Sequence, residues 1–291
     1  MSSEFRPQPQ PAPRYREVSI GHAPVAVTEE QGVLHMRSLE PLAELPARLL
    51  DRLAHWARGR AEQTFIAARQ ADGDWRRVSY AQMLESVRAI AQALLSYGLS
   101  ADKPLALLSG NDIEHLQLAL GAMYAGIPYC PVSPAYSLLS QDFAKLRHVC
   151  DLLQPGLVFV SDAAAYQRAI DAVLPAETPL ISVRGHVPGR AQVSFASLLQ
   201  TAAGSAADQA FMATGPDSIA KFLFTSGSTK LPKAVITTQR MLCANQQMLL
   251  QTFPVFGEEP PVLVDWLPWN HTFGGSHNVG IVLYNGGTLY L

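Results

Sequence analysis

The sequence predicts an α/β protein built on mostly parallel sheets. Short apolar segments alternate with helical segments of ten or more residues along most of the 291-residue chain. Strands that alternate with such helices imply crossover connections, which join parallel strands. The short strands are apolar throughout, as expected when a sheet is covered on both faces. A composition of 48% hydrophobic and 16% charged residues is sufficient for a sizeable core.

The first half of the chain supplies most of this pattern. Residues 1–40 begin with a Pro/Gln-rich stretch and are expected to form a partly disordered N-terminal extension. Apolar residues recur at helical spacing over 42–56, which predicts a helix. The stretches 64–69 and 74–80 flank Asp72-Gly73, a strong turn signal, and are expected to form a hairpin. The elements predicted next are helix 80–97, strand 103–111, helix 112–126, strand 127–134, helix 138–153, strand 156–161, helix 163–173 and strand 178–183.

The second half resumes the pattern after a change in composition. Residues 186–217 are richer in Gly, Ala, Ser and Pro, so we expect them to connect two α/β parts, residues 41–185 and 218–291. The elements predicted there are strand 220–225, helix 238–253, strand 261–268, helix 274–284 and a strand over 287–291. Because the last strand has no turn or polar tail, we expect the chain to be part of a longer protein.

Charge and cysteine content exclude several classes of function. A net charge of −2 gives no electrostatic basis for nucleic acid or an anionic membrane as the main partner. Cys130, Cys150 and Cys243 are far apart in sequence, which argues against a disulfide framework or a structural metal site. Without a secretion signal or an 18-residue apolar run, we expect a cytoplasmic protein with no membrane span. The oligomeric state is not indicated.

A hydroxyl-rich loop between two apolar strands is the first candidate site. Thr225-Ser226-Gly227-Ser228-Thr229 follows one strand, and Lys230 and Lys233 precede the next. Hydroxyl and backbone N–H groups bind phosphate, and a lysine compensates its charge. The loop lacks the second glycine of the P-loop pattern. Residue types alone leave two interpretations, a phosphate-binding loop and a solvated turn.

This loop resembles the signature of the adenylate-forming enzymes, which include acyl- and aryl-CoA synthetases, luciferases and peptide-synthetase adenylation domains. The resemblance implies that the phosphates of ATP bind to Thr225, Ser226, Gly227, Ser228, Thr229 and Lys233. Lys230 and Ala234 stand where that signature usually has glycine. The implied fold is the large N-terminal domain of such an enzyme, truncated before its small C-terminal domain.

A second motif, "DWLPWNHTFGG" over 265–275, resembles the segment that lines the acyl or aryl pocket in the same family. It implies a substrate pocket formed by Trp269, Asn270, His271, Phe273 and Gly274. A lone histidine beside apolar residues is more often a core residue, but the motif implies a pocket role for His271. We expect His277 to be structural. Trp266, Trp269 and Phe273 are either core residues or an aromatic wall for a planar substrate.

The family resemblance also implies a reaction. A carboxylate reacts with ATP to give an acyl-adenylate and pyrophosphate, and the acyl group then passes to the thiol of CoA. The strings around both motifs look most like feruloyl-CoA synthases, which indicates hydroxycinnamates such as ferulate; fatty acids are the alternative. The family's main Mg²⁺ ligand and its catalytic lysine belong to segments that this sequence does not contain, so we expect the 291-residue chain alone to be inactive and assign it no catalytic residue. The remaining alternatives are a non-catalytic ligand-binding remnant and an unrelated phosphate-binding regulator.

Overall fold

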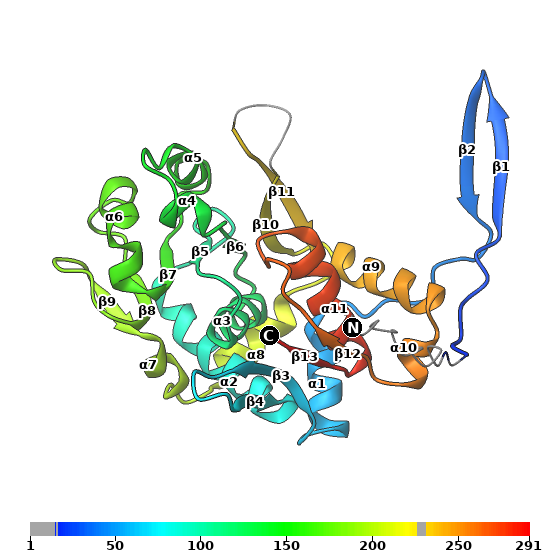
Figure 1. Ribbon diagram of the computed structural model, residues 1–291, viewed down its shortest axis with the longest axis horizontal. Helices are drawn as coiled ribbons and strands as arrows, with labels where there is room; N and C mark the ends of the chain where they lie inside the picture. The colour runs from blue at the N-terminus through cyan, green and yellow to red at the C-terminus, as the bar shows by residue number, and fades with distance from the viewer. Residues whose placement is uncertain (1–14, 16, 226–230) are drawn as a thin grey trace, which may run out of the picture.

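The computed structural model describes Tyr15 and residues 17–225 and 231–291. Within these residues the chain forms a seven-stranded sheet, a four-stranded sheet and a separate two-stranded hairpin (Figure 1). Helices pack against both larger sheets. The predicted α/β class with parallel-rich sheets is confirmed.

The seven-stranded sheet contains the strand that leads into the hydroxyl-rich loop. Its strands, in spatial order, are β11 (Lys233–Thr238), β10 (Ile219–Thr225), β6 (Tyr129–Pro131), β5 (Leu105–Leu108), β7 (Leu157–Asp162), β8 (Leu180–Arg184) and β9 (Gln192–Ser194). All neighbouring strands are parallel except β10 and β11, which are antiparallel. The hydroxyl-rich loop therefore connects β10 to the edge strand β11, its antiparallel neighbour in an otherwise parallel sheet.

Both faces of this sheet are covered, which explains its continuous apolar strands. Leu105 and Leu107 of β5 lie in one buried cluster, and Ala106 and Leu108 lie in another. This split follows from the alternation of side chains along a strand. The helices are α1 (Leu50–Gly59), α2 (Tyr80–Leu94), α3 (Ile113–Tyr124), α4 (Ala135–Leu138), α5 (Ala144–Leu153), α6 (Ala163–Val173), α7 (Phe195–Leu199), α8 (Ser205–Ala213), α9 (Gln239–Thr252), α10 (Val255–Glu258) and α11 (Val279–Asn285).

The second sheet joins the start of the domain to its end. Its order is β12 (Val262–Val264), β13 (Thr288–Tyr290), β3 (Thr64–Arg69) and β4 (Trp75–Ser79). The predicted β3–β4 hairpin is present, and Gly73 at its turn has φ +93°. The Tyr80 hydroxyl donates to the carbonyls of Val282 and Gly287 at 3.0 and 2.8 Å, so this side chain ties α2 to α11 and to the residue before β13.

Several helix boundaries follow from caps that the sequence contains. Ser79 and Gln82 form a capping box at the start of α2, and Thr238 caps α9. Gly98 ends the α2 region at φ +62°. These caps place both helices close to their predicted limits.

Other predicted boundaries were wrong. The first helix begins at Leu50 instead of residue 42, because Pro46 disfavours helix in the residue before it. The predicted helix 138–153 is two helices, α4 and α5, separated by a turn in which Phe143 has φ +54°. The strand predicted over 261–268 is limited to the three residues of β12.

Two segments hold elements that the sequence patterns did not indicate. Within residues 1–40, β1 (Val25–Glu30) and β2 (Val33–Ser38) pair as an antiparallel hairpin that stands away from the rest of the chain (Figure 1). Within residues 186–217, β9 extends the large sheet and is followed by α7 and α8. The proposed division into an extension, two α/β parts and a connection remains a prediction.

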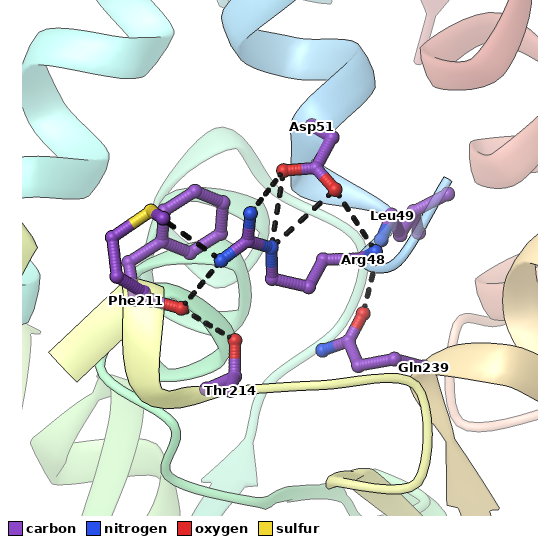
Figure 2. Close-up of polar contacts among 7 residues, drawn as sticks. Arg48, Leu49, Asp51, Phe211, Thr214 and Gln239 are labelled. Carbon is purple, nitrogen blue, oxygen red and sulfur yellow. Dashed lines mark hydrogen bonds and ion pairs between the residues drawn. The ribbon is translucent and has the colours of Figure 1, made fainter.

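Arg48 joins three segments of the fold just before α1. Its guanidinium forms an ion pair with Asp51 at 3.0 Å, donates to the Phe211 carbonyl at 2.9 Å and lies 4.2 Å from the centre of the Phe211 ring (Figure 2). The neighbouring Leu49 N–H donates to the buried Gln239 side chain at 3.0 Å. These contacts fix the chain that enters α1 against the ends of α8 and α9. Among the described helices, none is long and apolar enough to cross a membrane.

Candidate functional site

The site is built at the end of the β10–β11 hairpin. In the register of this pair, Thr225 lies opposite Lys233 and Leu223 opposite Val235. The predicted phosphate-binding residues Ser226, Gly227, Ser228 and Thr229, and also Lys230, lie outside the described residues. On the β11 side, the Pro232 carbonyl accepts a hydrogen bond from His148 Nε2 at 2.9 Å. Thr225 and Lys233 are therefore the two described ends of the candidate phosphate loop.

A cavity of about 610 Å³ opens beside this hairpin. It is bordered by β10 and β11, by the start of α9 and by the segment that contains the second sequence motif. Its lining includes Leu223, Thr225, Val235, Met241, Leu242, Asn270, His271, Phe273, Ser276 and His277. The cavity thus brings Thr225, at the start of the candidate phosphate loop, next to the segment for which a substrate pocket was predicted.

The second motif lies at the start of a π-helical segment, Phe273–Asn278, that continues into α11. Gly274 is required there, because a Cβ atom at this position would lie 2.5 Å from the Leu267 carbonyl oxygen. Single π-helical turns within helices are frequent at functional sites. This one directs Phe273, Ser276 and His277 to the lining of the cavity.

Two buried side chains hold the π-helical segment by its carbonyl groups. Lys221 Nζ of β10 donates to the Gly275 carbonyl at 2.8 Å. Gln246 Nε2 of α9 donates to the Ser276 carbonyl at 3.0 Å and to the His277 carbonyl at 3.3 Å. The segment that lines the cavity is therefore tied directly to the strand that leads into the phosphate loop.

The predicted pocket residues do not all lie in one place. Asn270, His271 and Phe273 line the cavity, as does Thr225. Trp269 is buried instead, with its ring centre 5.4 Å from that of His115. Gly274 contributes close backbone packing rather than a lining side chain.

The aromatic residues of the motif do not form a common wall. Trp266 is 83% exposed, Trp269 is buried and Phe273 is half-exposed beside the cavity. The partner of Phe273 is instead His277, whose ring stacks on it with a centroid distance of 4.5 Å. His277 was expected to be structural, but its i, i+4 relation to Phe273 is a signal that would have placed both on one helical face.

Lys221 is a further residue that the sequence reasoning missed, although a lysine inside the apolar strand 220–225 is visible there. It is only 1% exposed, and burial lowers the pKa of its ammonium group to about 7. The neighbouring His115 shares a 2.7 Å hydrogen bond with Ser109, and burial lowers the pKa of its ring to about 3, so it is neutral at pH 7. A perturbed cation next to a cleft is a feature of functional sites.

The described residues do not supply a site for Mg²⁺. Oxygen ligands, chiefly carboxylates, are needed to hold this ion. No Asp or Glu is among the described residues that line the cavity, and these parts of the chain contain no cluster of three or more His, Cys, Asp or Glu side chains suited to a metal. The nearby Asp265 has a structural role, since its Oδ1 accepts from Leu267 N and from Asn278 Nδ2 at 3.1 and 2.9 Å.

Comparisons with known proteins identify the family of this chain. The family model of the AMP-binding enzymes matches residues 53–291. A propanoyl:CoA ligase of Rhodococcus jostii (strain RHA1), whose acyl group carries a 7a-methyl-1,5-dioxo-octahydro-1H-inden-4-yl substituent, is 26% identical over 85% of this chain and 48% of its own length. A putative fatty-acid–CoA ligase, fadD21, of Mycobacterium leprae (strain TN) is 25% identical over 69% of this chain and 34% of its own length.

A solved structure shows the same fold. The fatty acyl-adenylate ligase of L. pneumophila, in complex with acyl adenylate and pyrophosphate, superposes with a TM-score of 0.63 and 19% identity, over 84% of this chain and 39% of that one. The chain thus spans about half or less of the length of these proteins. None of them is named a feruloyl-CoA synthase, so the narrower resemblance is not confirmed. The family match over most of the sequence shows that this chain belongs to the AMP-binding enzymes.

Proposed function

We propose that this chain is the N-terminal part of an ATP-dependent carboxylate–CoA ligase acting on a hydroxycinnamate such as ferulate. The observation that carries the proposal is the cavity of about 610 Å³, which borders both Thr225 and the Asn270–Phe273 segment. ATP phosphates bind at Thr225, Ser226, Gly227, Ser228, Thr229 and Lys233. The acid then lies in the cavity with its carboxylate toward this loop.

The proposed reaction has two steps, formation of the acyl-adenylate and transfer of the acyl group to CoA. A carboxylate oxygen attacks the α-phosphorus of ATP, the bond to the bridging oxygen breaks, and pyrophosphate leaves. The thiolate of CoA then attacks the carbonyl carbon of the acyl-adenylate, and AMP leaves. Mg²⁺ would enter bound to ATP and would offset the charge of its phosphates. The part of this chain is to bind and orient the two reactants.

The stacked pair Phe273–His277 supports a planar substrate. The two rings lie 19° from parallel and border the cavity, so a third flat ring can pack against their exposed edges or faces. The lining of the cavity also includes the apolar side chains of Leu223, Val235 and Leu242. These apolar side chains also favour a fatty acid as the second candidate, as does the similarity to a protein named as a putative fatty-acid–CoA ligase.

The isolated 291-residue chain is expected to be inactive. Its described residues place no carboxylate beside the cavity to hold Mg²⁺, and the family's catalytic lysine belongs to a segment outside this sequence. ATP–pyrophosphate exchange measured with the isolated chain should therefore stay at background. Exchange above background that requires ferulate would contradict this expectation.

The substrate assignment is tested by binding. Ferulate and a saturated fatty acid of similar length are titrated against the chain by calorimetry, with Phe273→Ala as the site variant and Lys103→Met, an exposed position, as the matched control. We expect ferulate to bind more tightly and Phe273→Ala to weaken it several-fold, since an aromatic pair contributes about 0.5–1.5 kcal/mol. Tighter binding of the fatty acid would favour the second candidate.

A further inference from the structure

A second, much smaller cavity lies next to the large one. It measures about 20 Å³ and shares two lining residues, Leu242 and Ser276, with the large cavity. We call it the donor chamber, because its lining includes Lys221, Trp269 and Ser276. A space of this size accommodates one water molecule or one oxygen-sized group.

The polar groups around the donor chamber are incompletely satisfied. Trp269 Nε1 and Ser276 Oγ are buried, and neither has a hydrogen-bond partner among the described residues. An indole N–H only donates, and a hydroxyl donates or accepts. A buried N–H without a partner loses its hydration and gains nothing in exchange, so such groups call for a ligand or an ordered water.

When it is protonated, the Lys221 ammonium group carries a positive charge, and the described residues that line the chamber include no Asp or Glu to offset it. The ammonium group has three donors, and the hydrogen bond found for it among the described residues goes to the Gly275 carbonyl. The ring of Tyr129 lies 5.8 Å from Nζ, and the other nearby titratable side chain, His115, is neutral at pH 7. A buried cation without a counter-charge is costly, and an acceptor that reached the chamber would offset part of this cost.

The geometry of β10 relates the chamber to the acid cavity. Side chains alternate along a strand, so Lys221, Leu223 and Thr225 share one face. Leu223 and Thr225 line the large cavity, whereas Lys221 lines the chamber. Four residues of strand place Lys221 about 13 Å from Thr225. An acid whose carboxylate lies near Thr225 therefore extends toward the chamber.

We propose that the donor chamber is the floor of the acid-binding cavity, and that Lys221, Trp269 and Ser276 select carboxylic acids with an oxygen at the end remote from the carboxylate. This inference rests on the proposed function, because it requires the acid to bind in the large cavity. The side chain of Ser276, at the boundary of the two cavities, then contacts the distal oxygen, and the ammonium and indole groups donate to it. An alkyl end would leave the indole N–H and the hydroxyl without partners and would offer the ammonium group no acceptor beyond the Gly275 carbonyl.

The experiment compares two acids that differ by one oxygen, 4-hydroxycinnamate and cinnamate. Their dissociation constants are measured by calorimetry for the unaltered chain, for Lys221→Met and for the control Lys103→Met. We expect the unaltered chain and the control to favour 4-hydroxycinnamate by at least about tenfold, the effect of a hydrogen bond to a charged group. In Lys221→Met the ratio of the two dissociation constants should fall below about threefold, whatever the change in the affinity for cinnamate.

Two milder variants keep the test decisive if Lys221→Met does not fold. Trp269→Phe removes the indole N–H, and Ser276→Ala removes the hydroxyl; each should lower the preference by about two- to fivefold. An unchanged preference in all three variants, or no preference in the unaltered chain, would overturn the inference and leave the ligase assignment intact. If neither acid binds the unaltered chain, the acid site itself is wrong and both proposals fall. A fatty acid that binds more tightly than 4-hydroxycinnamate would contradict the role of the chamber.

Discussion

The two ends of the cavity-facing side of β10 differ in how they use polar residues. At one end, Thr225 is exposed, lies opposite Lys233 and leads into the phosphate loop. At the other end, Lys221 is buried between sheet and helix and bonds to the π-helical segment. The first end is open to solvent, whereas the second is buried, so electrostatic effects are larger at the second end. Under the proposed function, binding of phosphates and choice of acid depend on opposite ends of one strand.

The largest effect is expected from Lys221→Met, on the pH dependence of the free energy of unfolding. Burial lowers the pKa of Lys221 to about 7 in the folded state, against 10.5 as its ordinary value. Between these values the unfolded chain binds a proton that the folded chain has released, so stability rises with pH. The cost of burying the charge is thus complete below pH 7 and absent above pH 10.5.

Chemical denaturation from pH 6 to 10 measures this directly. The stability of the unaltered chain should rise relative to Lys221→Met by up to about 1.4 kcal/mol per pH unit between 7 and 10. A difference in the free energy of unfolding between the two proteins that does not change with pH would mean that the pKa of Lys221 is not lowered. This result would contradict the distinction drawn between the exposed and buried ends of β10.

The next largest effect is expected on tripolyphosphate binding at the exposed end of β10, next to Thr225. Lys233→Ala should weaken binding of tripolyphosphate, a probe that requires only the phosphate loop, by about ten- to a hundredfold through loss of a charge-assisted contact. Lys221→Met should leave it unchanged within about twofold, because that side chain lies about 13 Å along the strand. Calorimetric titration gives both values. Equal losses of tripolyphosphate affinity in the two variants would show that the two ends of β10 do not act independently.

A smaller effect is expected for His271→Ala, which alters the cavity wall between the two ends. We expect a three- to tenfold change in the relative affinities of ferulate and cinnamate, on the order of 1 kcal/mol, with tripolyphosphate binding retained. Competition titrations of the two acids measure the ratio. If only tripolyphosphate binding falls, His271 belongs to the phosphate end.

The smallest effect should come from Trp266→Ala. This side chain is 83% exposed and does not line the cavity, so its removal should change the free energy of unfolding by less than about 0.5 kcal/mol. Acid binding should also be unaffected. A clear loss of ferulate affinity in calorimetry would instead support the hypothesis that Trp266 belongs to an aromatic wall for the substrate.

Local patterns in the sequence predicted the elements and much of the lining. The apolar runs of β5 and β7 and the caps of α2 and α9 gave those elements close to their observed positions. The motif around His271 identified residues that do line the cavity. These features depend on neighbours in sequence, which is why they can be recognised without a structure.

Features that depend on distant contacts could not be predicted in this way. Trp269 and Phe273 are four residues apart, yet one is buried beside His115 and the other borders the cavity. The donor chamber exists because β10, α3 and the π-helical segment meet there, and no local pattern specifies that meeting. The β1–β2 hairpin has little core contact, so its apolar residues gave no periodic burial signal to recognise.

The most direct test of the account is to locate bound ferulate on the chain. Saturation-transfer and nuclear Overhauser measurements on the complex report which protein side chains lie against the ring of the acid. We predict contacts from the ring of ferulate to Phe273 and His277. We also predict that ferulate no longer binds to a Thr225→Arg variant, whose larger side chain fills the end of the cavity next to the loop, when tripolyphosphate is present. Ferulate that binds without contacting either ring, or that binds equally well to this variant, would contradict the placement of the acid beside the phosphate loop.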